Sequence, residues 1–545
     1  MPLTLALAVP SLTARNTNEI ELQPQKVKKW LDELPLLNVA ETARKLFTTL
    51  SLHNRVEYNS GLRLQLLELF RYPVSQLSLE LSKQYTGLPL PLSEKHKSVA
   101  EQNRQFQMEM ANGYKRIALS MPAPSTHSAQ EHAFRALVIE RAIRYLTGAL
   151  AVSYQTYSPS PEGAWKEIHA LYSHAESLGL VEIEIEDSFN KTVSACSVNH
   201  AYKQALLLDF SDPYNLPPRM VDWTHHYLDR WAPLAQLTAV TSAYNPTCQF
   251  LIDQHNDHAG IAYTAGTVPE DPKRYRLLNT VELARQVHAQ LTQLIHGEKP
   301  PTEGLQENFF QECGQDLLRR LVNAWGVNPQ RSFRRSQATN RQMEIAVGMD
   351  RINYWINGGK KFVVSSSFVG PVPQRTMLAS EEIRHKDIHI PGRELSTWDV
   401  EDESAGGLAL SKSGQIRLHI QVGDLLVSRS PGEGNAWSVG VIRWVRNTGS
   451  SSLDIGIQHL APRADPVVIK TVNENGKESD FLPALLLPEI KPLKQPQTLI
   501  THRGVFKPET GVFMDDGCRL YRIAPARLIE SSHSFEQFSF NILNT

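Results

Sequence analysis

The sequence predicts a protein of several domains, in which a helical region comes first and a β-rich region follows. Three observations support this fold class: a length of 545 residues, helical periodicity over roughly residues 26–325, and short strand-like segments after Pro329. A chain of this length exceeds one ordinary domain. We therefore expect a domain of helical hairpins over residues 1–326, an antiparallel β-barrel over residues 327–464, and a β extension or second small barrel over residues 465–545.

Apolar residues recur at helical spacing through the first part of the chain. A long helix is expected from about Glu131 to Tyr154, because its apolar residues form one broad stripe. An earlier helical segment carries Leu66 and Leu69. We expect Pro73 to end that segment, because proline lacks the amide hydrogen that a helix interior needs.

One helix of this region resembles the first helix of a tetratricopeptide repeat. Trp165 and Tyr172 stand seven positions apart, as in such a repeat, and Gly179 closes the helix. EIEIED then replaces the expected second helix, and no regular repeat period follows. We therefore expect a degenerate array of helical hairpins in which both aromatic residues pack between helices. An aromatic peptide-binding groove is the alternative interpretation.

Composition excludes several classes of function. Lys and Arg number 56 against 57 Asp and Glu, which gives a net charge of -1. DNA and anionic membranes both require a sustained basic field, so neither is an expected partner. A small anionic ligand stays possible, because a few clustered arginines suffice for it.

The cysteines and the apolar segments indicate the cellular compartment of the protein. Cys196, Cys248, Cys313 and Cys518 are far apart and form no CxxC pair, so they predict reduced thiols. No stretch has the roughly 18 consecutive apolar residues that would cross a bilayer. The apolar start MPLTLALAVPSL lacks the positive charge of a signal peptide and predicts a short N-terminal strand or docking segment. We expect a cytoplasmic protein without membrane insertion.

After the turn-forming residues 326–329 the chain changes character. Short segments rich in β-branched and aromatic residues alternate with turns, and they predict the strands of a closed barrel: MEIAVG, GLAL, IRLHI, DLLVSR, WSVGVIRWV and LDIGIQHL. Residues 350–356 are an exception, because Asp350 can cap a single helical turn there. Further strand-like segments continue to the end of the chain.

Two clusters of polar residues in the β region are candidates for a binding site. Arg331, Arg334 and Arg335 lie within five residues directly after the turn. A guanidinium grips phosphate oxygens with two parallel hydrogen bonds and also stacks on a purine face. Three such groups can therefore converge on one anion.

The second cluster is the segment Asp402-Glu-Ser404-Ala-Gly-Gly407, a turn that opens into a strand. A carboxylate and a hydroxyl two residues apart project to the same side of an extended backbone. Asp402 can accept hydrogen bonds from guanine N–H groups, and Ser404 can donate or accept. Gly407 permits close approach of a backbone and a φ angle that other residues resist.

These residues resemble the PilZ family, whose signature is RxxxR followed by (D/N)xSxxG. Arg331 and Arg335 match the first element, and Asp402, Ser404 and Gly407 match the second. Residues 441–444 (VIRW) and 455–458 (IGIQ) are similar to the last two strands of the family barrel. Asp402 lies 67 positions after Arg335, wider than in a minimal PilZ domain. We expect the helix at 350–356 and the loop after it to be insertions into the PilZ domain, which would account for this wider spacing.

The resemblance implies a receptor for the bacterial second messenger cyclic di-GMP, not an enzyme. Arg331 and Arg335 would clamp phosphate and the guanine Hoogsteen edge, with Arg334 as a third contact or a solvated neighbour. Asp402 and Ser404 would hold a guanine edge. No other cofactor is expected. The helical region would relay the signal to a protein partner, and ligand capture could reset the angle between the domains. The family resemblance suggests motility, pilus function or biofilm control.

Three other functions remain open at this point. The main alternative is a PilZ-like scaffold that binds no ligand and acts through protein contacts. A nucleic-acid-binding barrel is disfavoured by the neutral charge. A metal-dependent enzyme would use His225 and His226, or the residues around His255 and His258. We expect no metal site, because adjacent helical side chains point apart and the second group lies in a polar loop.

Overall fold

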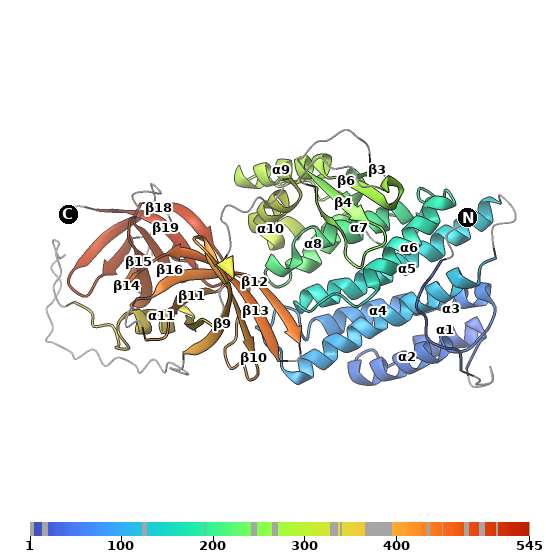
Figure 1. The fold of residues 1–545 in the computed structure, drawn as a ribbon, viewed down its shortest axis with the longest axis horizontal. Helices are drawn as coiled ribbons and strands as arrows, with labels where there is room; N and C mark the ends of the chain where they lie inside the picture. The colour runs from blue at the N-terminus through green and yellow to red at the C-terminus, as the bar shows by residue number, and fades with distance from the viewer. Residues whose placement is uncertain are drawn as a thin grey trace. The chain divides into compact units, whose positions relative to one another are not determined.

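The structure, a computed structural model, divides into two compact units. It describes residues 5–13, 20–122, 128–190, 192–240, 248–263, 271–326, 336–337, 340–365, 395–432, 436–449, 451–472, 479–489, 496–507 and 511–543. The first unit, here the helical unit, comprises Met1–Leu88 and Leu92–Gln330, and the second, the barrel unit, comprises Pro89–Pro91 and Arg331–Thr545. Figure 1 colours the helical unit blue to green and the barrel unit yellow to red. The predicted order of helices first and barrels second is confirmed.

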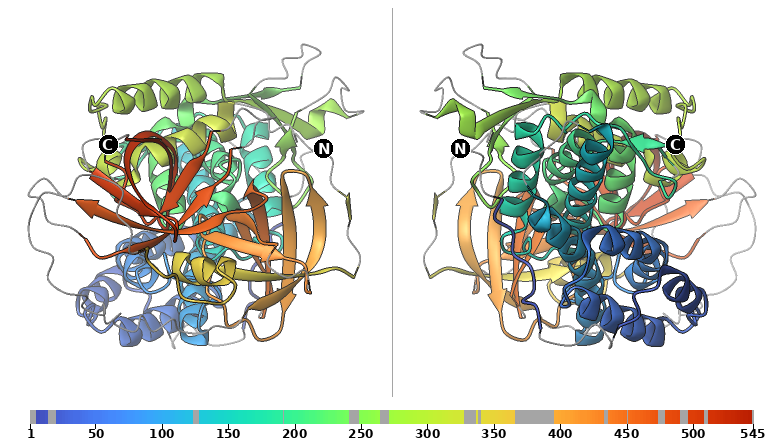
Figure 2. Two further views of the ribbon diagram at one scale, coloured as in Figure 1. Left: turned by 90° about the vertical axis from the view of Figure 1, so that its left-hand side faces the viewer. Right: turned by 90° about the vertical axis from the view of Figure 1, so that its right-hand side faces the viewer.

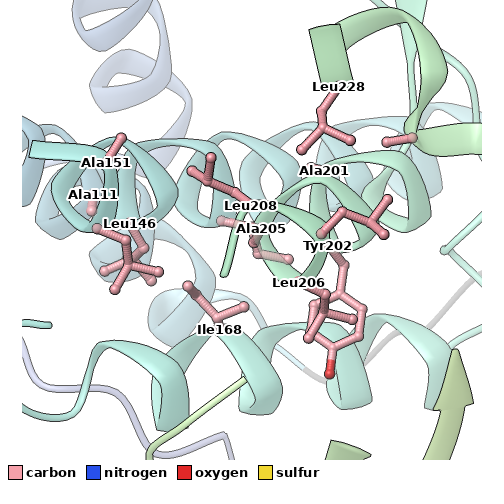
Figure 3. Packing of buried hydrophobic residues seen from close by; sticks show 14 of the residues in the cluster. Ala111, Leu146, Ala151, Ile168, Ala201, Tyr202, Ala205, Leu206, Leu208 and Leu228 are labelled. Carbon is pink, nitrogen blue, oxygen red and sulfur yellow. The ribbon is translucent and has the colours of Figure 1, made fainter. Parts of the chain in front are cut away.

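Long helices form most of the helical unit. They are α1 (Pro24–Asp32), α2 (Val39–His53), α3 (Ser60–Ser82), α4 (Glu94–Ser120), α5 (Ala129–Gln155), α6 (Ala164–Ser177), α7 (Val198–Asp209), α8 (Met220–Trp231), α9 (Val281–Ile295) and α10 (Phe309–Gly326). Apolar residues of successive helices meet in one core, where Leu146 of α5, Ile168 of α6 and Leu206 of α7 are completely buried. Figure 3 shows these three side chains among the packed apolar residues of the cluster. The predicted long helix is α5.

Pro73 does not end its helix, contrary to the sequence-based expectation. It lies inside α3, which continues for nine residues to Ser82. Phe70 and Val74, on either side of it, are each 1% exposed. Burial of such side chains contributes roughly 1.5–3 kcal/mol each, which outweighs the one backbone hydrogen bond that the proline removes.

The two aromatic residues of the repeat-like helix lie in the core. Trp165 and Tyr172 on α6 are 2% and 4% exposed. The Tyr172 ring stacks on Tyr202 of α7, with centroids 4.0 Å apart and planes inclined by 13°. They therefore hold α6 against α7, and the alternative of an aromatic peptide-binding groove is wrong.

The helical unit also contains two small sheets. β1 (Ile185–Glu186) pairs with β2 (Ala195–Cys196). A four-stranded sheet has the order β3-β6-β4-β5 and consists of β3 (Gln236–Ala239), β4 (Gln249–Asp253), β5 (Ile261–Ala262) and β6 (Tyr275–Asn279). Strands of two to five residues are too short to show a period of their own, so the sequence pattern does not predict them.

Six strands of the barrel unit close into the first barrel. They are β8 (Gln342–Val347), β9 (Ser396–Ser404), β10 (Gly407–Ser413), β11 (Leu425–Arg429), β12 (Ser438–Gly449) and β13 (Ser452–Ala461). β9 pairs with both β8 and β10, which closes the ring. A short strand β7 (Ser336–Gln337) also pairs with β9. The predicted strand IRLHI forms no ladder, since only Ile420 makes an isolated bridge.

The C-terminal strands form a second closed barrel. Its strand order is β14-β15-β16-β19-β18-β17. The strands are β14 (Asp465–Val472), β15 (Leu482–Leu487), β16 (Thr498–Thr501), β17 (Gly511–Asp515), β18 (Leu520–Ser531) and β19 (Glu536–Ile542). Val467, Leu499 and Phe538 are completely buried in its own core. Of the two expectations for this region, the small barrel is the one that the structure shows.

A short helix joins the two barrels. α11 (Met349–Ile356) follows β8, and Figure 1 shows it beside the second barrel. The side-chain amide of its buried residue Asn353 donates to the backbone oxygens of Val467 and Ala484, both at 2.9 Å. Asp350 does not cap this helix, because Gly348 stands at the cap position with a φ of 94°. Apolar residues of both barrels and α11 share one buried cluster.

Candidate functional site

The DxSxxG segment forms a tight hairpin between β9 and β10. Asp402 and Ser404 belong to the end of β9, and Gly407 begins β10, so only residues 405 and 406 form the turn. Ser404 lies opposite Gly407, and Asp402 lies opposite Ala409. The Ser404 hydroxyl lies 3.4 Å from the Gly407 oxygen. The structure thus brings the three motif residues of this segment together.

Strand alternation places these residues on the outer face of the first barrel. Leu408 and Leu410 are 4% and 0% exposed and point into the barrel. Gly407 therefore belongs to the outer face, because successive side chains of a strand alternate. Residues directly opposite each other point to the same side, so Ser404 lies on the outer face too. Asp402 and Ser404 are half-buried and keep access to solvent.

Gly407 is required by the neighbouring strand β13. A Cβ atom added at residue 407 would lie 2.0 Å from the backbone oxygen of Ile457, and no side chain can approach a backbone that closely. The expected close approach is confirmed. The expected unusual φ is wrong, since Gly407 is not among the residues of positive φ.

Trp444 of β12 extends this surface across the barrel. Gly456 of β13 lies opposite both Ala409 and Trp444. A Cβ added at Gly456 would lie 1.8 Å from Nε1 of Trp444, so the indole covers the glycine backbone. We call the row of outward residues the outer platform: Asp402, Ser404, Gly407, Ala409, Gly456 and Trp444. Figure 2 shows the curvature of the sheet that carries it.

The outer platform has a carboxylate at one end, small residues in the middle and an aromatic ring at the other end. Neighbouring strands lie about 4.8 Å apart, so roughly 10 Å separates the backbones of Asp402 and Gly456. Sequence reasoning used Trp444 and Gly456 as markers of strands and missed their place in the site. The signal that identifies them is the register between β12 and β13, which the sequence does not give.

Arg443 lies beside the outer platform and is held by the second barrel. Its Nε donates to Oε1 of Gln458 at 2.6 Å, and its two terminal nitrogens donate to Glu530 of β18 at 2.6 and 2.9 Å. Gln458 lies opposite Gly407 of the motif. The second barrel thus fixes a guanidinium next to the hairpin, which the sequence did not indicate.

Arg331, Arg334 and Arg335 lie outside the described residues. The strand that follows them in the chain is described: Ser336 lies opposite Glu403, and Gln337 lies opposite Asp402. The carboxylate of Glu403 pairs with Arg341. Ser336 and Gln337, the described residues that directly follow these arginines in the chain, therefore pair with β9, the strand that carries Asp402 and Ser404.

A half-buried histidine of β13, His459, adjoins the hairpin. The His459 amide donates to the oxygen of Gly406 at 3.0 Å, which ties the turn to β13. Burial lowers the pKa of the His459 side chain, against an opposing effect of Glu403. This histidine therefore adds no positive charge to the site near neutral pH.

The loop with two histidines in the helical unit has a structural role. Asp257 accepts hydrogen bonds from the amides of Gly163 and Lys166 at 2.7 and 3.2 Å, and so caps α6. Asp253 pairs with Arg274.

Within the described ranges, no group of three His, Cys, Asp or Glu side chains is placed to hold a metal ion. The same ranges contain no helix whose length and apolarity would let it span a bilayer.

The closed antiparallel barrel with DxSxxG on its outer face defines a PilZ-type domain. Family models match the chain in three consecutive parts: "Cyclic-di-GMP receptor FimW, N-terminal domain" over residues 25–243, "Cyclic-di-GMP receptor FimW, middle PilZ domain" over 249–387 and 374–466, and "FimW C-terminal beta-barrel domain" over 467–543. The chain therefore contains a PilZ domain in its middle part, in the three-part arrangement that these models describe.

One curated relative has a comparable length. The cyclic-di-GMP receptor FimW of Pseudomonas aeruginosa is 28% identical, and the match covers 98% of this chain and 93% of the relative. No solved structure matches the chain. The resemblance found in the sequence is therefore confirmed at the level of the family.

Proposed function

We propose that the chain is a cyclic di-GMP receptor and not an enzyme, and that it holds its ligand on the outer platform. One observation carries the proposal. Arg335 is bonded to Ser336, and Ser336 is paired with Glu403, between Asp402 and Ser404. Consecutive Cα atoms are about 3.8 Å apart, so covalent geometry alone limits how far Arg335 can be from Ser336 on the strand that pairs with the motif.

The chemistry of these residues fits a dinucleotide with two guanines and two phosphates. Arg331 and Arg335 supply the bidentate donors that phosphate oxygens and the guanine Hoogsteen edge accept. Asp402 supplies the acceptor that guanine N–H groups need. The Trp444 indole supplies an aromatic surface on which a purine can stack.

The binding free energy expected from these contacts is sufficient for micromolar affinity without a basic surface. A hydrogen bond to a charged group contributes roughly 1.5–3 kcal/mol. Micromolar affinity corresponds to about −8 kcal/mol. Two arginines, one carboxylate and one stacked base reach that value, which is consistent with a net charge of only -1.

Calorimetric titration with cyclic di-GMP, with GTP and cyclic di-AMP as controls, tests the proposal. We expect Arg335→Ala and Asp402→Ala each to weaken binding at least tenfold, with thermal unfolding near wild type. Asp399→Ala on the same strand is the control for Asp402, because its side chain is exposed and bonds only Gln342 in the described part of the chain. Arg285→Ala, an exposed arginine of α9, is the control for Arg335.

Unchanged affinity in both site variants would exclude these residues from the site. No binding by the wild-type chain would instead favour a PilZ-like scaffold that acts through protein contacts. For the relay of the signal, we infer that ligand capture resets the angle between the two units and that the helical unit contacts a protein partner. Small-angle scattering with and without ligand tests this, and superimposable curves would contradict it.

A further inference from the structure

The N-terminal segment of the helical unit, residues 5–13, lies extended along three helices without joining a helix or a sheet. Its exposure alternates: Leu5, Leu7 and Val9 are half-buried, while Ala6 and Ala8 are exposed. Leu5 and Leu7 pack on the helical core. The segment therefore presents one apolar edge to the helices, as an extended peptide does when it binds a protein surface.

The polar contacts of this segment are made mainly by side chains of the helices. Oε1 of Glu167, in the first turn of α6, accepts a hydrogen bond from the Ala8 amide at 2.6 Å. Arg116 of α4 donates to the oxygen of Pro10. At the far end, the amide of Thr13 donates to the oxygen of Arg55, just after α2, at 2.8 Å. These contacts recognise a main chain, not a particular side chain.

The helices hold these groups in place by contacts of their own. Lys115, of which 1% of the side chain is exposed, pairs with the other oxygen of Glu167 at 2.8 Å. Arg55 pairs with Glu109 of α4 at 3.2 Å. The contacts that orient the carboxylate and the Arg55 carbonyl thus do not involve the segment. We call the surface formed by Arg55, Arg116 and Glu167, with Lys115 as the buried partner of Glu167, the docking strip.

The segment itself is held weakly. None of its residues 5–13 is fully buried, whereas the helices beneath it contain many completely buried side chains. Regions with few buried apolar contacts open at low free energy while the rest of the fold stays intact. If the segment leaves, water can solvate Glu167 and Arg116 at the surface, and their neighbours keep them oriented.

We propose that the docking strip is a binding site for an extended segment of a partner protein, and that residues 5–13 occupy it in the absence of that partner. The partner segment is an extended chain with apolar side chains at alternate positions and a free amide and carbonyl at the positions of Ala8 and Pro10. The chain's own segment acts as a competitor at an effective concentration in the millimolar range, because it is tethered. The inference is independent of the ligand proposed for the barrel.

The test uses a fluorescent synthetic peptide of residues 5–13, LALAVPSLT, and the chain without residues 2–13. We expect saturable anisotropy with the shortened chain and at least tenfold weaker binding to the full chain. In the shortened chain, Arg116→Ala should weaken peptide binding at least tenfold. Arg104→Ala on the same helix is the matched control, because Arg104 pairs only with Glu101 in the described part of the chain.

A second variant keeps the full length. Leu5→Asp combined with Leu7→Asp should release the segment, retain the helical circular dichroism and bind the peptide as the shortened chain does. The proposal is overturned if the shortened chain loses its helical fold, because the segment would then be part of the core structure. It is also overturned if neither variant gives saturable binding, or if a scrambled peptide binds equally well.

Discussion

The indole of Trp444 occupies the volume that a side chain at residue 456 would need. A Cβ built on Gly456 meets three atoms of the indole at 1.8 to 2.4 Å. The two residues face each other across β12 and β13. The position of the aromatic ring on the outer platform therefore depends on the absence of one carbon atom.

Gly456→Ala should displace Trp444 and weaken ligand binding. Overpacking of this kind costs typically 1–3 kcal/mol, so we expect a lower free energy of unfolding as well as a loss of affinity. Chemical denaturation and calorimetric titration measure the two effects. Gly449→Ala is the control in the same hairpin, because its Cβ would meet only Ser452 at an ordinary 3.9 Å. Equal affinity of both variants would show that the indole does not contact the ligand.

Acid should destabilise the helical unit through His169. Burial lowers the pKa of His169 to about 4, and the ring bonds the Tyr202 hydroxyl at 2.7 Å and the His258 oxygen at 2.9 Å. The fold thus prefers the neutral ring, so the stabilisation is complete above the ordinary pKa of 6.5 and is lost as the pH falls from there toward 4. The loss amounts to about 3 kcal/mol, at roughly 1.4 kcal/mol per pKa unit.

Urea unfolding at pH 7 and pH 4.5 measures this dependence. In His169→Gln the free energy of unfolding should fall less between the two pH values than in wild type. A part of the slope should remain, because burial also lowers the pKa of His53 to about 4. His288→Gln, at an exposed position of α9, controls for the loss of a histidine. An identical slope in wild type and His169→Gln would contradict the prediction.

Asn353→Leu should destabilise the barrel unit by about 3 kcal/mol. The substitution leaves two backbone oxygens, those of Val467 and Ala484, without the amide that now bonds them. Each unsatisfied buried polar group costs roughly 1–3 kcal/mol. Asn357→Leu at the end of the same helix is the control, since its amide bonds only the nearby Lys360 oxygen at 3.0 Å in the described part of the chain. Thermal unfolding of both variants should separate them by several degrees.

Strands and motif residues with a local pattern were predictable from the sequence. The segments of β8, β11, β12 and β13 carry β-branched residues between turns, β10 begins with the apolar run GLAL, and DxSxxG is contiguous. β9 was missed as a strand because its sequence STWDVEDES carries four acidic residues, which occur rarely in strands. Here the pairing with β8 and β10 prevails over the weak preference of the residues.

Features that depend on register or packing were not predictable. A glycine within a strand usually indicates a weak point, and only the alignment of β12 with β13 shows that Gly456 makes room for Trp444. The sequence alone would predict that Arg443 is exposed to solvent. Its ion pair with Glu530 depends on the packing of the second barrel against the first. The continuation of α3 past Pro73 depends on neighbouring helices that lie far away in sequence.

The contacts of helix α11 with both barrels indicate how the two barrels were inherited. One amide on it serves two strands of the second barrel, and Ile352 next to it lies in a cluster shared by both barrels. A genetic exchange that separated the barrels would leave each of them with an exposed apolar surface. The pair should therefore have been inherited as one piece, with natural recombination points falling before β7 and not between the two barrels.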